Sequence, residues 1–360
     1  DGIKIGVFGL GIELAGLVDP RMFKETIYLD PVEIAQDMSR ILKDDEGCDL
    51  VICLSHLGYH YSSDKINDLE LASKTKNEIT KWVFENIEKP KNYSFLKETF
   101  GNLRKLAQNP VNLNTFALYC IGAEDNKAKH LYEQFEGKPV HIDYDIFGTI
   151  TGRLTTKRGS FPILNLKKDL KNHVRPQNDV FLELDFNAAE IRTLLSLQGI
   201  EQPQEDIHEW NIKNVFKKEL SRDEAKRKIF AWLYNPESNA IESNIYDRQS
   251  LLEKHYRGGE VQTPFGRSIP APDSKALNYL LQSTSSDNTI DRFNKISRFL
   301  GPSRSKVVAV IHDSVIIDLH REDRGMIPHL KQIFEETKLG RFKVNVSLGK
   351  NLGSLKEFKW

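Results

Sequence analysis

Two acidic residues in apolar surroundings are the first candidates for chemistry in this sequence. Asp313 follows His312 within KVVAVIHDSVIIDL, residues 306–319, and Asp185 ends the apolar run VFLELD. A carboxylate within an apolar strand is costly unless a partner stabilises its charge. If the two strands pair side by side, the carboxylates meet, and a divalent cation such as Mg²⁺ would offset their repulsion. The alternative is a tight hairpin with His-Asp-Ser at its tip and no metal, and the stretch alone leaves both open.

A helix predicted over residues 222–234 carries a second group of candidates. Ser221 is its expected N-cap, and Glu224 completes a capping box. Arg222, Lys226, Phe230 and Tyr234 recur every four residues and therefore share one face. Two cations followed by two aromatic rings suit a nucleoside triphosphate, which is polyanionic at one end and flat at the other. A solvated basic helix with buried aromatic residues is the alternative for this segment taken alone.

Composition and charge set limits on the class of protein. The 360 residues include 39% hydrophobic and 28% charged residues, which is typical of soluble proteins. No run approaches a membrane span and no signal peptide opens the chain, so we expect a cytoplasmic protein without a membrane partner. Cys48, Cys53 and Cys120 lack metal-ligand spacing and are expected to be reduced. Residues 1–77 carry a net charge of −6 and the remainder +6, which predicts two pieces of different origin.

The acidic piece, residues 1–77, is predicted to form a small α/β segment. Apolar strands around GIKIGVFGLG and CDLVICLSHLG flank a helix with Asp30 as N-cap and Pro31 at its first position. GVFGLGIEL and DLVICLSHLGY resemble the 5′-nucleotidase branch of the calcineurin-like metallophosphoesterases. That resemblance makes His56 a possible vestigial metal ligand. The other metal ligands of the family are absent, so we expect a fold fragment without hydrolase activity.

The basic piece becomes recognisable from several motifs that occur in a fixed order. They are TGRL (151–154), DFNAAEIR (185–192), DIHEWNIKNVF (206–216), RDEAKRKIFAWLY (222–234), TPFGR (263–267), LNYLLQSTSSD (277–287), IHDS (311–314) and GKNLGSL (349–355). Residues 139–360 thereby resemble the family A DNA polymerases, the group of bacterial polymerase I and many phage replicases. The resemblance implies an α+β fold with an antiparallel palm sheet and helical fingers. Residues 78–138 would form a helical linker or reduced thumb.

The resemblance also implies roles for individual residues. Asp185 and Asp313 would be the catalytic pair that binds two Mg²⁺ ions, with Mn²⁺ able to substitute. The residues implied to bind the incoming nucleotide are Arg222, Lys226, Phe230, Tyr234, Glu190 and His208, with Glu190 as the steric gate against a 2′-hydroxyl. Those implied to contact DNA are Arg153, Asn165, Arg267, Asn278, Gln282 and His312. The implied partners are primer–template DNA, deoxynucleoside triphosphates (dNTPs) and possibly a processivity factor.

Three departures from the family pattern keep other functions open. Ser314 stands where a glutamate usually follows the second aspartate, and Asn235-Pro236 follow Tyr234 where glycine is usual. The thumb-like segment is also small. The main prediction is template-directed DNA synthesis in a bacterial or phage-infected cell. The alternatives are a weak or inactive primer–template binding module and, third, a nucleotide phosphohydrolase centred on His56.

Overall fold

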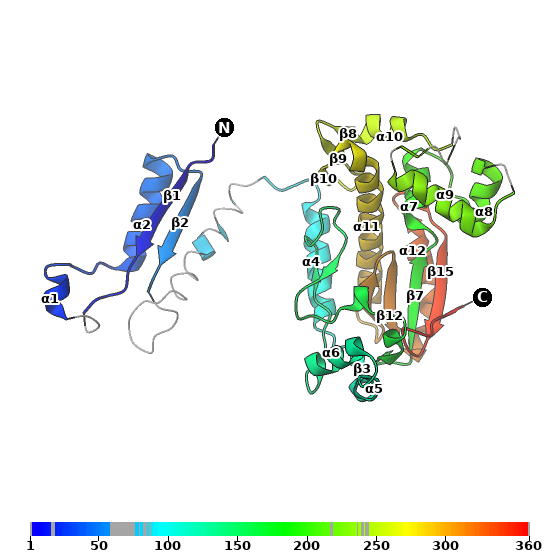
Figure 1. The fold of residues 1–360 in the computed structure, drawn as a ribbon, viewed down its shortest axis with the longest axis horizontal. Coiled ribbons are helices and arrows are strands. Elements are labelled where there is room, and N and C mark those ends of the chain that lie inside the picture. Colours follow the sequence, from blue (N-terminus) through cyan, green and yellow to red (C-terminus); the bar gives the residue numbers. More distant parts are fainter. Residues whose placement is uncertain are drawn as a thin grey trace. The chain divides into compact units, whose positions relative to one another are not determined.

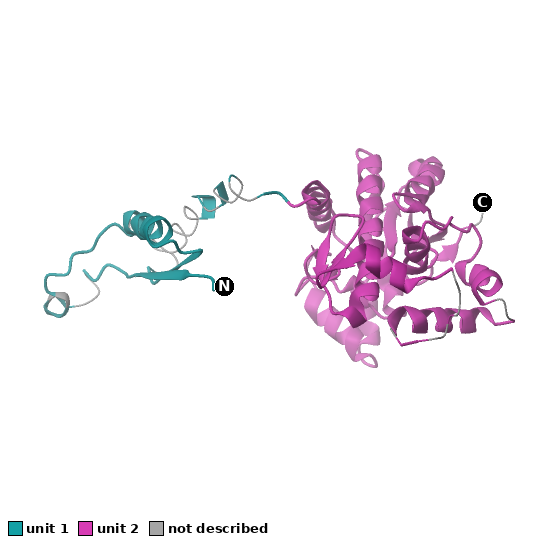
Figure 2. Ribbon diagram, turned by 90° about the horizontal axis from the view of Figure 1, so that it is seen from above, with its two compact units in different colours: residues 1–89 teal, residues 90–360 magenta. Residues whose placement is uncertain are grey.

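The computed structural model describes residues 2–15, 19–57, 76–78, 80–81, 85, 88–216, 219–235, 237–238, 241 and 245–358. The chain divides into two compact units, residues 1–89 and 90–360 (Figure 2). The predictions for residues 58–75 and for Pro236 fall outside the described residues. No helix in the described part of the chain is long and apolar enough to cross a membrane.

The first unit contains a βαβ arrangement, as the sequence predicts. Strands β1 (Ile5–Leu10) and β2 (Leu50–Ser55) pair in parallel and are connected through helix α2 (Pro31–Arg40). Asp30 caps α2 by accepting hydrogen bonds from the backbone of Val32 and Glu33 at 2.8 and 3.1 Å. The short helix α1 (Pro20–Phe23) lies between β1 and α2, and the turn η1 (Ile41–Asp45) extends α2.

The second unit is built on a five-stranded antiparallel sheet with the order β11-β12-β7-β15-β16 (Figure 1). Its strands are β7 (Val180–Phe186), β11 (Lys306–Ile311), β12 (Ser314–Leu319), β15 (Val344–Gly349) and β16 (Lys356–Glu357). Leu182 and Leu184 of β7 point to a fully buried face, whereas Glu183 and Asp185 alternate onto a partly exposed face. The sheet therefore has one apolar face and one face that is available to a ligand.

Helices pack against this sheet and against one another. They are α4 (Tyr93–Ala107), α5 (Thr115–Ile121), α6 (Asn126–Phe135), α7 (Ala189–Leu197), α8 (Ile207–Asn211), α9 (Arg222–Tyr234), α10 (Arg248–His255), α11 (Asp273–Leu300) and α12 (Ile327–Glu335). Shorter turns are η2 (Ile163–Asn165), η3 (Leu170–His173), η4 (Ile212–Phe216) and η5 (Arg321–Met326). Together with the sheet, this mixture of helices and strands fits the predicted α+β class.

Small two- and three-stranded sheets complete the second unit. They pair β3 (Asn112–Leu113) with β6 (Val174–Arg175), β4 (Tyr144–Asp145) with β5 (Thr155–Thr156), β9 (Glu260–Gln262) with both β8 (Tyr256–Arg257) and β10 (Ser268–Pro270), and β13 (Glu336–Thr337) with β14 (Gly340–Arg341).

Two hydrophobic cores stabilise the second unit. The first lies at the apolar face of the sheet, where Leu184, Phe334 and Phe342 are fully buried. The second lies among α7 to α11, around Ile191, Ile229 and other apolar residues. Helix α11 contributes to both cores and contacts α4, α7, α9 and α12. Because α7 directly follows β7, the end of β7 lies where the two cores meet.

Candidate active site

The hairpin between β11 and β12 places His312 and Asp313 at its tip. The two residues form the whole connection, since Ile311 pairs with Ser314 on either side of it. His312 has φ = 53°, a left-handed conformation for which histidine, asparagine and aspartate are enriched among residues other than glycine. The hairpin predicted from the sequence is therefore present, and it directs two polar side chains to one end of the sheet.

Asp185 lies next to this tip because β7 pairs with β12. Ser314 is opposite Asp185 in the register, and the backbone N–H of Phe186 donates to the carbonyl oxygen of Asp313 at 3.3 Å. Asn345 of β15 flanks Asp185 on its other side and donates from Nδ2 to the carboxylate at 3.4 Å. Backbone pairing thus brings the two aspartates together from distant parts of the chain.

Both carboxyl groups are difficult to ionise in this environment. Burial, followed by the charges of Glu183 and Asp313, raises the pKa of Asp185 to about 7. Burial and the charge of Glu190 raise the pKa of Asp313 to about 6, against the opposing effect of Arg153. Neither aspartate forms an ion pair with a described residue, and no described donor hydrogen-bonds the Asp313 carboxylate. Such an arrangement would be stabilised by a cation bound between the two groups.

The chemistry of these donors fits a hard divalent cation. Carboxylate oxygens are the ligands that Mg²⁺ uses in proteins, and it usually needs only one or two of them together with substrate phosphates. Among the described residues, no group of three or more histidine, cysteine, aspartate or glutamate side chains is arranged to hold a metal. The two aspartates would therefore bind ions together with phosphate oxygens and water.

Glu190 links the aspartates to helix α9. It is 8% exposed at the start of α7, where Arg153 forms an ion pair with one carboxylate oxygen and the Tyr234 hydroxyl donates to the other. Burial and the Glu190 carboxylate raise the pKa of Tyr234, and the charge of Asp313 adds to this effect. Asp313, Glu190 and Tyr234 are therefore neighbours in one electrostatic environment.

Helix α9 carries the predicted face of cations and aromatic rings. Its capping box between Ser221 and Glu224 is present in both directions. Phe230 and Tyr234 stack with ring centroids 5.8 Å apart and planes 4° from parallel. Lys226 is exposed, and no ion pair of its ammonium group is found in the described part of the chain. This face of α9 therefore runs from Tyr234, which contacts Glu190, to the exposed ammonium group of Lys226.

The first turn of α9 is connected to α8 through an ion pair. Arg222 donates from Nη2 to the Asp206 carboxylate at 2.9 Å. Burial opposes ionisation of Asp206, yet hydrogen bonds from Arg222 and Asn187 hold its pKa well below the usual value. Two residues further on, the His208 ring lies 6.5 Å from that of Phe230. The Nδ1 atom of His208 is buried and finds no hydrogen-bond partner among the described residues, and burial lowers its pKa.

Arg192 fixes the loop that leads into α8. Its side chain is fully buried and donates to the carbonyl oxygens of Asn187, Pro203 and Glu205 at 2.7, 2.6 and 3.0 Å. This arginine belongs to the motif DFNAAEIR, and nothing in the motif alone predicts its role. Its hydrogen bonds connect the end of β7 to the segment that presents Asp206 and His208.

A cavity of about 260 Å³ opens beside Asp313. Arg153, Asn165 and His312 line it together with Asp313, so three of the predicted DNA-contacting residues lie around one hollow. Partial burial, followed by the charges of Arg153 and Lys171, lowers the pKa of His312. The hollow is next to Asp313 and is lined by side chains that can donate hydrogen bonds.

Three further residues predicted to contact DNA are in different environments. Asn278 and Gln282 lie one turn apart on α11; the Oδ1 atom of Asn278 is buried without a partner among the described residues, and Gln282 accepts from Thr151 at 2.8 Å. Arg267 instead forms a two-pronged ion pair with buried Asp287, with contacts of 2.7 and 3.0 Å, and its side chain is 14% exposed. This pair ties the β9–β10 turn to α11, so most of the Arg267 guanidinium is engaged within the protein.

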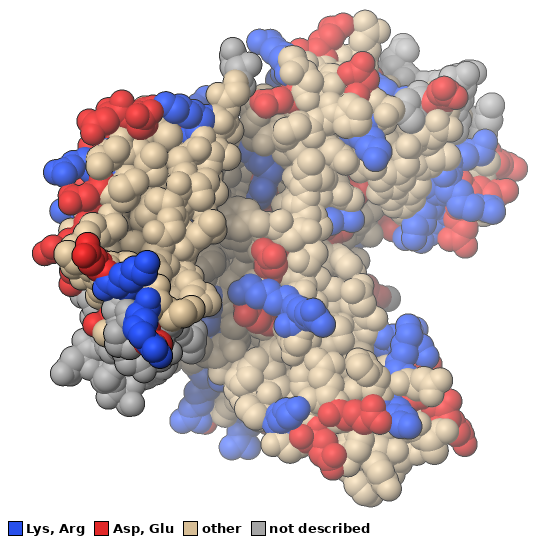
Figure 3. All heavy atoms as spheres, turned by 60° about the vertical axis from the view of Figure 1, so that its left-hand side comes forward, with Lys and Arg blue, Asp and Glu red and all other residues tan. Residues whose placement is uncertain are grey.

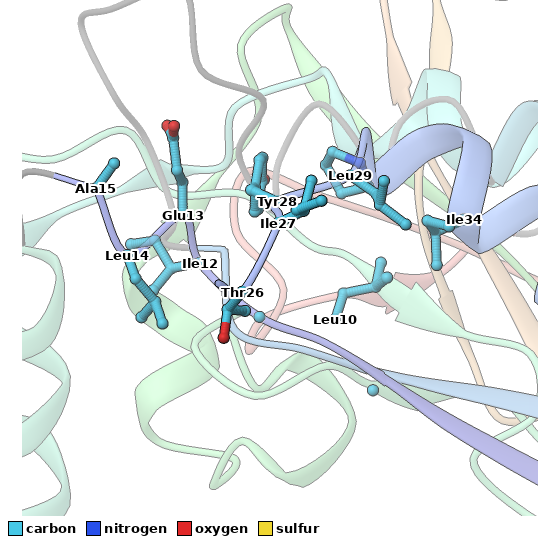
Figure 4. Close-up of a pocket in the computed structure, with 13 residues that line it drawn as sticks. Leu10, Ile12, Glu13, Leu14, Ala15, Thr26, Ile27, Tyr28, Leu29 and Ile34 are labelled. Atoms are coloured by element: carbon cyan, nitrogen blue, oxygen red, sulfur yellow. The ribbon is translucent and has the colours of Figure 1, made fainter. Parts of the chain in front are cut away.

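His56 in the first unit is exposed at the end of β2, and its backbone N–H donates to the carbonyl oxygen of Leu10 at 2.9 Å. Among the described residues, it belongs to no group of three or more possible metal ligands. A pocket of about 490 Å³ in this unit is lined by residues such as Leu10, Ile27 and Leu29 (Figure 4). Among its described lining residues, Glu13 carries the only charge. Neither feature supports a hydrolytic metal centre in the described part of this unit.

On the face that Figure 3 shows, surface charge is mixed: lysine and arginine side chains alternate with aspartate and glutamate. This view gives no continuous basic track of the kind that a strongly cationic DNA-binding surface would present. Groups that could contact phosphates are therefore best identified by their position around the site.

Sequence reasoning missed two residues that complete the site beside Asp185. Glu183 lies two positions earlier on the same face of β7 and receives a hydrogen bond from the Ser314 hydroxyl at 3.3 Å. Burial raises the pKa of Glu183, whereas Ser314 and the charge of Lys171 lower it. Asn345 is the second. Strand alternation places Glu183 on the face of Asp185, but the role of Asn345 depends on strand order, which the sequence does not specify.

Comparisons with known proteins agree with this geometry. No family model matches the chain. The chain is 23% identical to the DNA polymerase of Bacillus phage SP01 over 276 residues, which covers 56% of this chain and 30% of the phage protein. Its structure is similar to the POL domain of Pol1 from M. smegmatis in complex with DNA primer–template and dNTP. That match has a TM-score of 0.52 and 13% sequence identity, and it covers 73% of this chain and 66% of the other.

The chain thus spans less than a third of the curated relative and about two thirds of the structural one. The structural match shows a shared fold. The phage relative adds a similarity in sequence to a DNA polymerase. The likeness of residues 1–77 to nucleotidases remains a prediction. For the rest, the predicted resemblance is confirmed: this chain is similar to the family A-type DNA polymerases.

Proposed function

We propose that this protein synthesises DNA on a template by transferring nucleotides from dNTPs to a primer 3′-hydroxyl. The observation that carries the proposal is the pairing of β7 with β12, in which Asp185 lies opposite Ser314 and therefore next to Asp313 at one end of the sheet. The charge of Glu190 acts on Asp313, and contacts join Glu190 to Tyr234 and Tyr234 to Phe230 on α9. Carboxylates at one end and cations at the other match the two ends of a metal-bound triphosphate.

In this proposal the sheet is the palm, α8 to α10 belong to the fingers, and the helices of residues 78–138 form a reduced thumb. Asp185 and Asp313 hold the ions, with Arg222, Lys226 and His208 on the triphosphate. When bound, two Mg²⁺ ions would neutralise phosphate charge and lower the pKa of the primer hydroxyl. Phe230 and Tyr234 pack beside the sugar and base, and Glu190 blocks a 2′-hydroxyl. The residues proposed to hold primer–template are Arg153, Asn165, Arg267, Asn278, Gln282 and His312.

The proposed reaction is an in-line displacement at the α-phosphorus. The primer 3′-oxygen forms a bond to that phosphorus while the bond between the phosphorus and the α–β bridging oxygen breaks. Pyrophosphate leaves, and the hydroxyl proton passes to solvent. The protein's part is to orient the two reactants and to offset their charge, which is the main source of catalysis in phosphoryl transfer.

Binding without turnover is the second candidate function. It is favoured by the end of α9 at Tyr234, with Asn235 already in an extended conformation, and by the small size of the helices between residues 93 and 135. Such a protein would grip primer–template but would not close over a nucleotide. A processivity factor would be needed for long products if synthesis does occur.

Extension of a labelled primer on a DNA template tests the two functions against each other. Wild-type protein with Mg²⁺ and dNTPs should lengthen the primer, and Asp313→Asn, purified identically, should not. Chelation of the metal should stop extension, and Mn²⁺ should restore it. Tight binding of the same DNA without any extension in either metal would establish the binding module instead.

A further inference from the structure

Glu183 is a carboxylate on the open face of the sheet for which the proposed mechanism has no use. It shares this face with Asp185, because the two residues are separated by one position on β7. The Ser314 hydroxyl, opposite Asp185 in the register, lies 3.3 Å from Glu183 Oε1 and 3.1 Å from the carbonyl oxygen of Ile311, and its single proton can be donated to either acceptor. Glu183 is partly buried, and its charge acts on Asp185.

The three acidic side chains lack balancing cations. Asp185, Asp313 and Glu183 take part in no ion pair among the described residues, although other acidic residues of the second unit do, as Glu190 does with Arg153. Lys171 on η3 is the cation whose charge acts on Glu183, and it forms no hydrogen bond to that carboxylate in the structure. Glu183 and Asp185 place two carboxylates on one face of β7, and a cation bound near Asp185 and Asp313 would reduce the repulsion among the three acidic groups.

The identity of the residue at position 314, a serine, bears on the role of Glu183. In the family that the chain resembles, the residue after the second aspartate is usually a glutamate, and here it is a serine. A serine hydroxyl cannot supply negative charge, but it can orient a neighbouring carboxylate. Ser314 is within hydrogen-bond distance of Glu183, so a carboxylate absent from this position of β12 is present on the adjacent strand β7.

We propose that Glu183 is a positioning residue of the metal site, oriented by Ser314, and that it increases the affinity of the Asp185–Asp313 pair for divalent cations. The proposal rests on the proposed polymerase function. Since Glu183 belongs to no group of three acidic residues close enough to bind one ion, it acts through water or through its charge, not as a third direct ligand. Carboxylates of this kind orient bound water and direct ligands.

Binding of Mn²⁺ to the full-length protein, followed by electron paramagnetic resonance without DNA or nucleotide, tests the proposal. Glu183→Gln preserves the shape of the side chain and should weaken Mn²⁺ binding by about tenfold. Glu201→Gln, which changes an exposed glutamate outside the site, should leave it unchanged. An affinity of Glu183→Gln within about twofold of wild type, with an unaltered melting temperature, would overturn the proposal.

Extension kinetics separate positioning from a purely structural role. Glu183→Gln should raise the Mg²⁺ concentration for half-maximal extension while the rate at saturating Mg²⁺ stays close to wild type. The double variant Glu183→Ser, Ser314→Glu moves the carboxylate to β12 and should recover metal affinity lost in Glu183→Ser. A fall in the saturating rate without a change in metal requirement would contradict the proposal.

The outcomes distinguish this inference from the proposed function. If Asp313→Asn abolishes extension but Glu183→Gln binds Mn²⁺ like wild type, only the role of Glu183 is lost. The polymerase proposal itself fails if the wild-type protein does not extend primers and if Asp185→Asn and Asp313→Asn bind Mn²⁺ as tightly as wild type.

Discussion

One end of the sheet and helix α9 form the two sides of the candidate site, and they hold their charged groups in different ways. The aspartates are fixed by backbone pairing between β7 and β12, and no cation of the described residues pairs with them. On α9, Arg222 is already paired with Asp206, and Tyr234 donates to Glu190. The sheet side thus needs an added cation, whereas the helix side must exchange existing contacts to bind an anion. This difference predicts that metal binding depends on the negative charge of the aspartates. Nucleotide binding is predicted to depend on which contacts of Arg222 and Tyr234 are broken.

The largest effect on the helix side is expected at Lys226. Lys226→Ala removes an exposed cation and should raise the KM for dNTP about tenfold to a hundredfold, because charge-assisted contacts contribute roughly 1.5–3 kcal/mol. Lys228→Ala, a nearby exposed lysine off the predicted stripe, is the matched control for steady-state primer extension. Equal effects of the two substitutions would remove the reason to single out this face of α9.

Glu190 connects the two sides, so its removal should affect selection of the sugar. Glu190→Ala opens space next to Tyr234 and should reduce discrimination against ribonucleotides by about tenfold or more, measured as the ratio of kcat/KM values. Tyr234→Phe keeps the ring and loses only the hydrogen bond to Glu190, and it separates the gate from the aromatic stack. Unchanged discrimination in Glu190→Ala would exclude the steric-gate role.

A smaller effect is expected from releasing Arg222. Asp206→Asn keeps a good N-cap for α8 but weakens the ion pair, which joins a half-exposed arginine to a more buried carboxylate. Since partly exposed pairs contribute about 0.2–1 kcal/mol, the KM for dNTP should fall about twofold to fivefold. A rise in KM would show that Asp206 positions Arg222 for the nucleotide instead of competing with it.

The smallest effect concerns stability on the sheet side. The raised pKa values of about 7 for Asp185 and about 6 for Asp313 mean that the folded chain binds these protons more tightly than the unfolded chain, whose values lie near 4. The associated stability is complete below pH of about 4 and is lost as the pH rises through 6 and 7. Without metal, the melting temperature should therefore fall by roughly 2–6 °C between pH 5 and 8.

Two variants and one control check this dependence by thermal denaturation. Asp185→Asn and Asp313→Asn should each flatten the decline and melt above wild type at pH 8, whereas Glu201→Gln should follow wild type. Added Mg²⁺ should raise the melting temperature of wild type at pH 8 but not that of the Asn variants. A wild-type profile that rises from pH 5 to 8 would contradict the assigned direction of the pKa shifts.

Local features of this chain were predictable because they depend on neighbouring residues. The Ser221–Glu224 capping box and the Asp30 cap each depend on residues a few positions apart and occur as predicted. The hairpin also forms, but with a tip one residue shorter than predicted, because Ser314 pairs with Ile311. The adjacency of Asp185 and Asp313 was predicted from the cost of isolated charges, and the register agrees with it. By contrast, the burial of Arg267 against Asp287 was not foreseen, because an arginine in a turn is usually solvated.

The sequence by itself determined which groups could do chemistry here, since the periodicity of α9 and the polarity of two strand ends are local properties. Only the tertiary structure decided their partners: strand order set Asn345 beside Asp185, Ser314 lay within hydrogen-bond distance of Glu183, and Asp206 paired with Arg222. These contacts join residues from separate elements, and the packing of the sheet against two cores fixes which side chains meet. For that reason the charged residues of the site could be predicted from the sequence, whereas the ion pairs and hydrogen bonds between them could not.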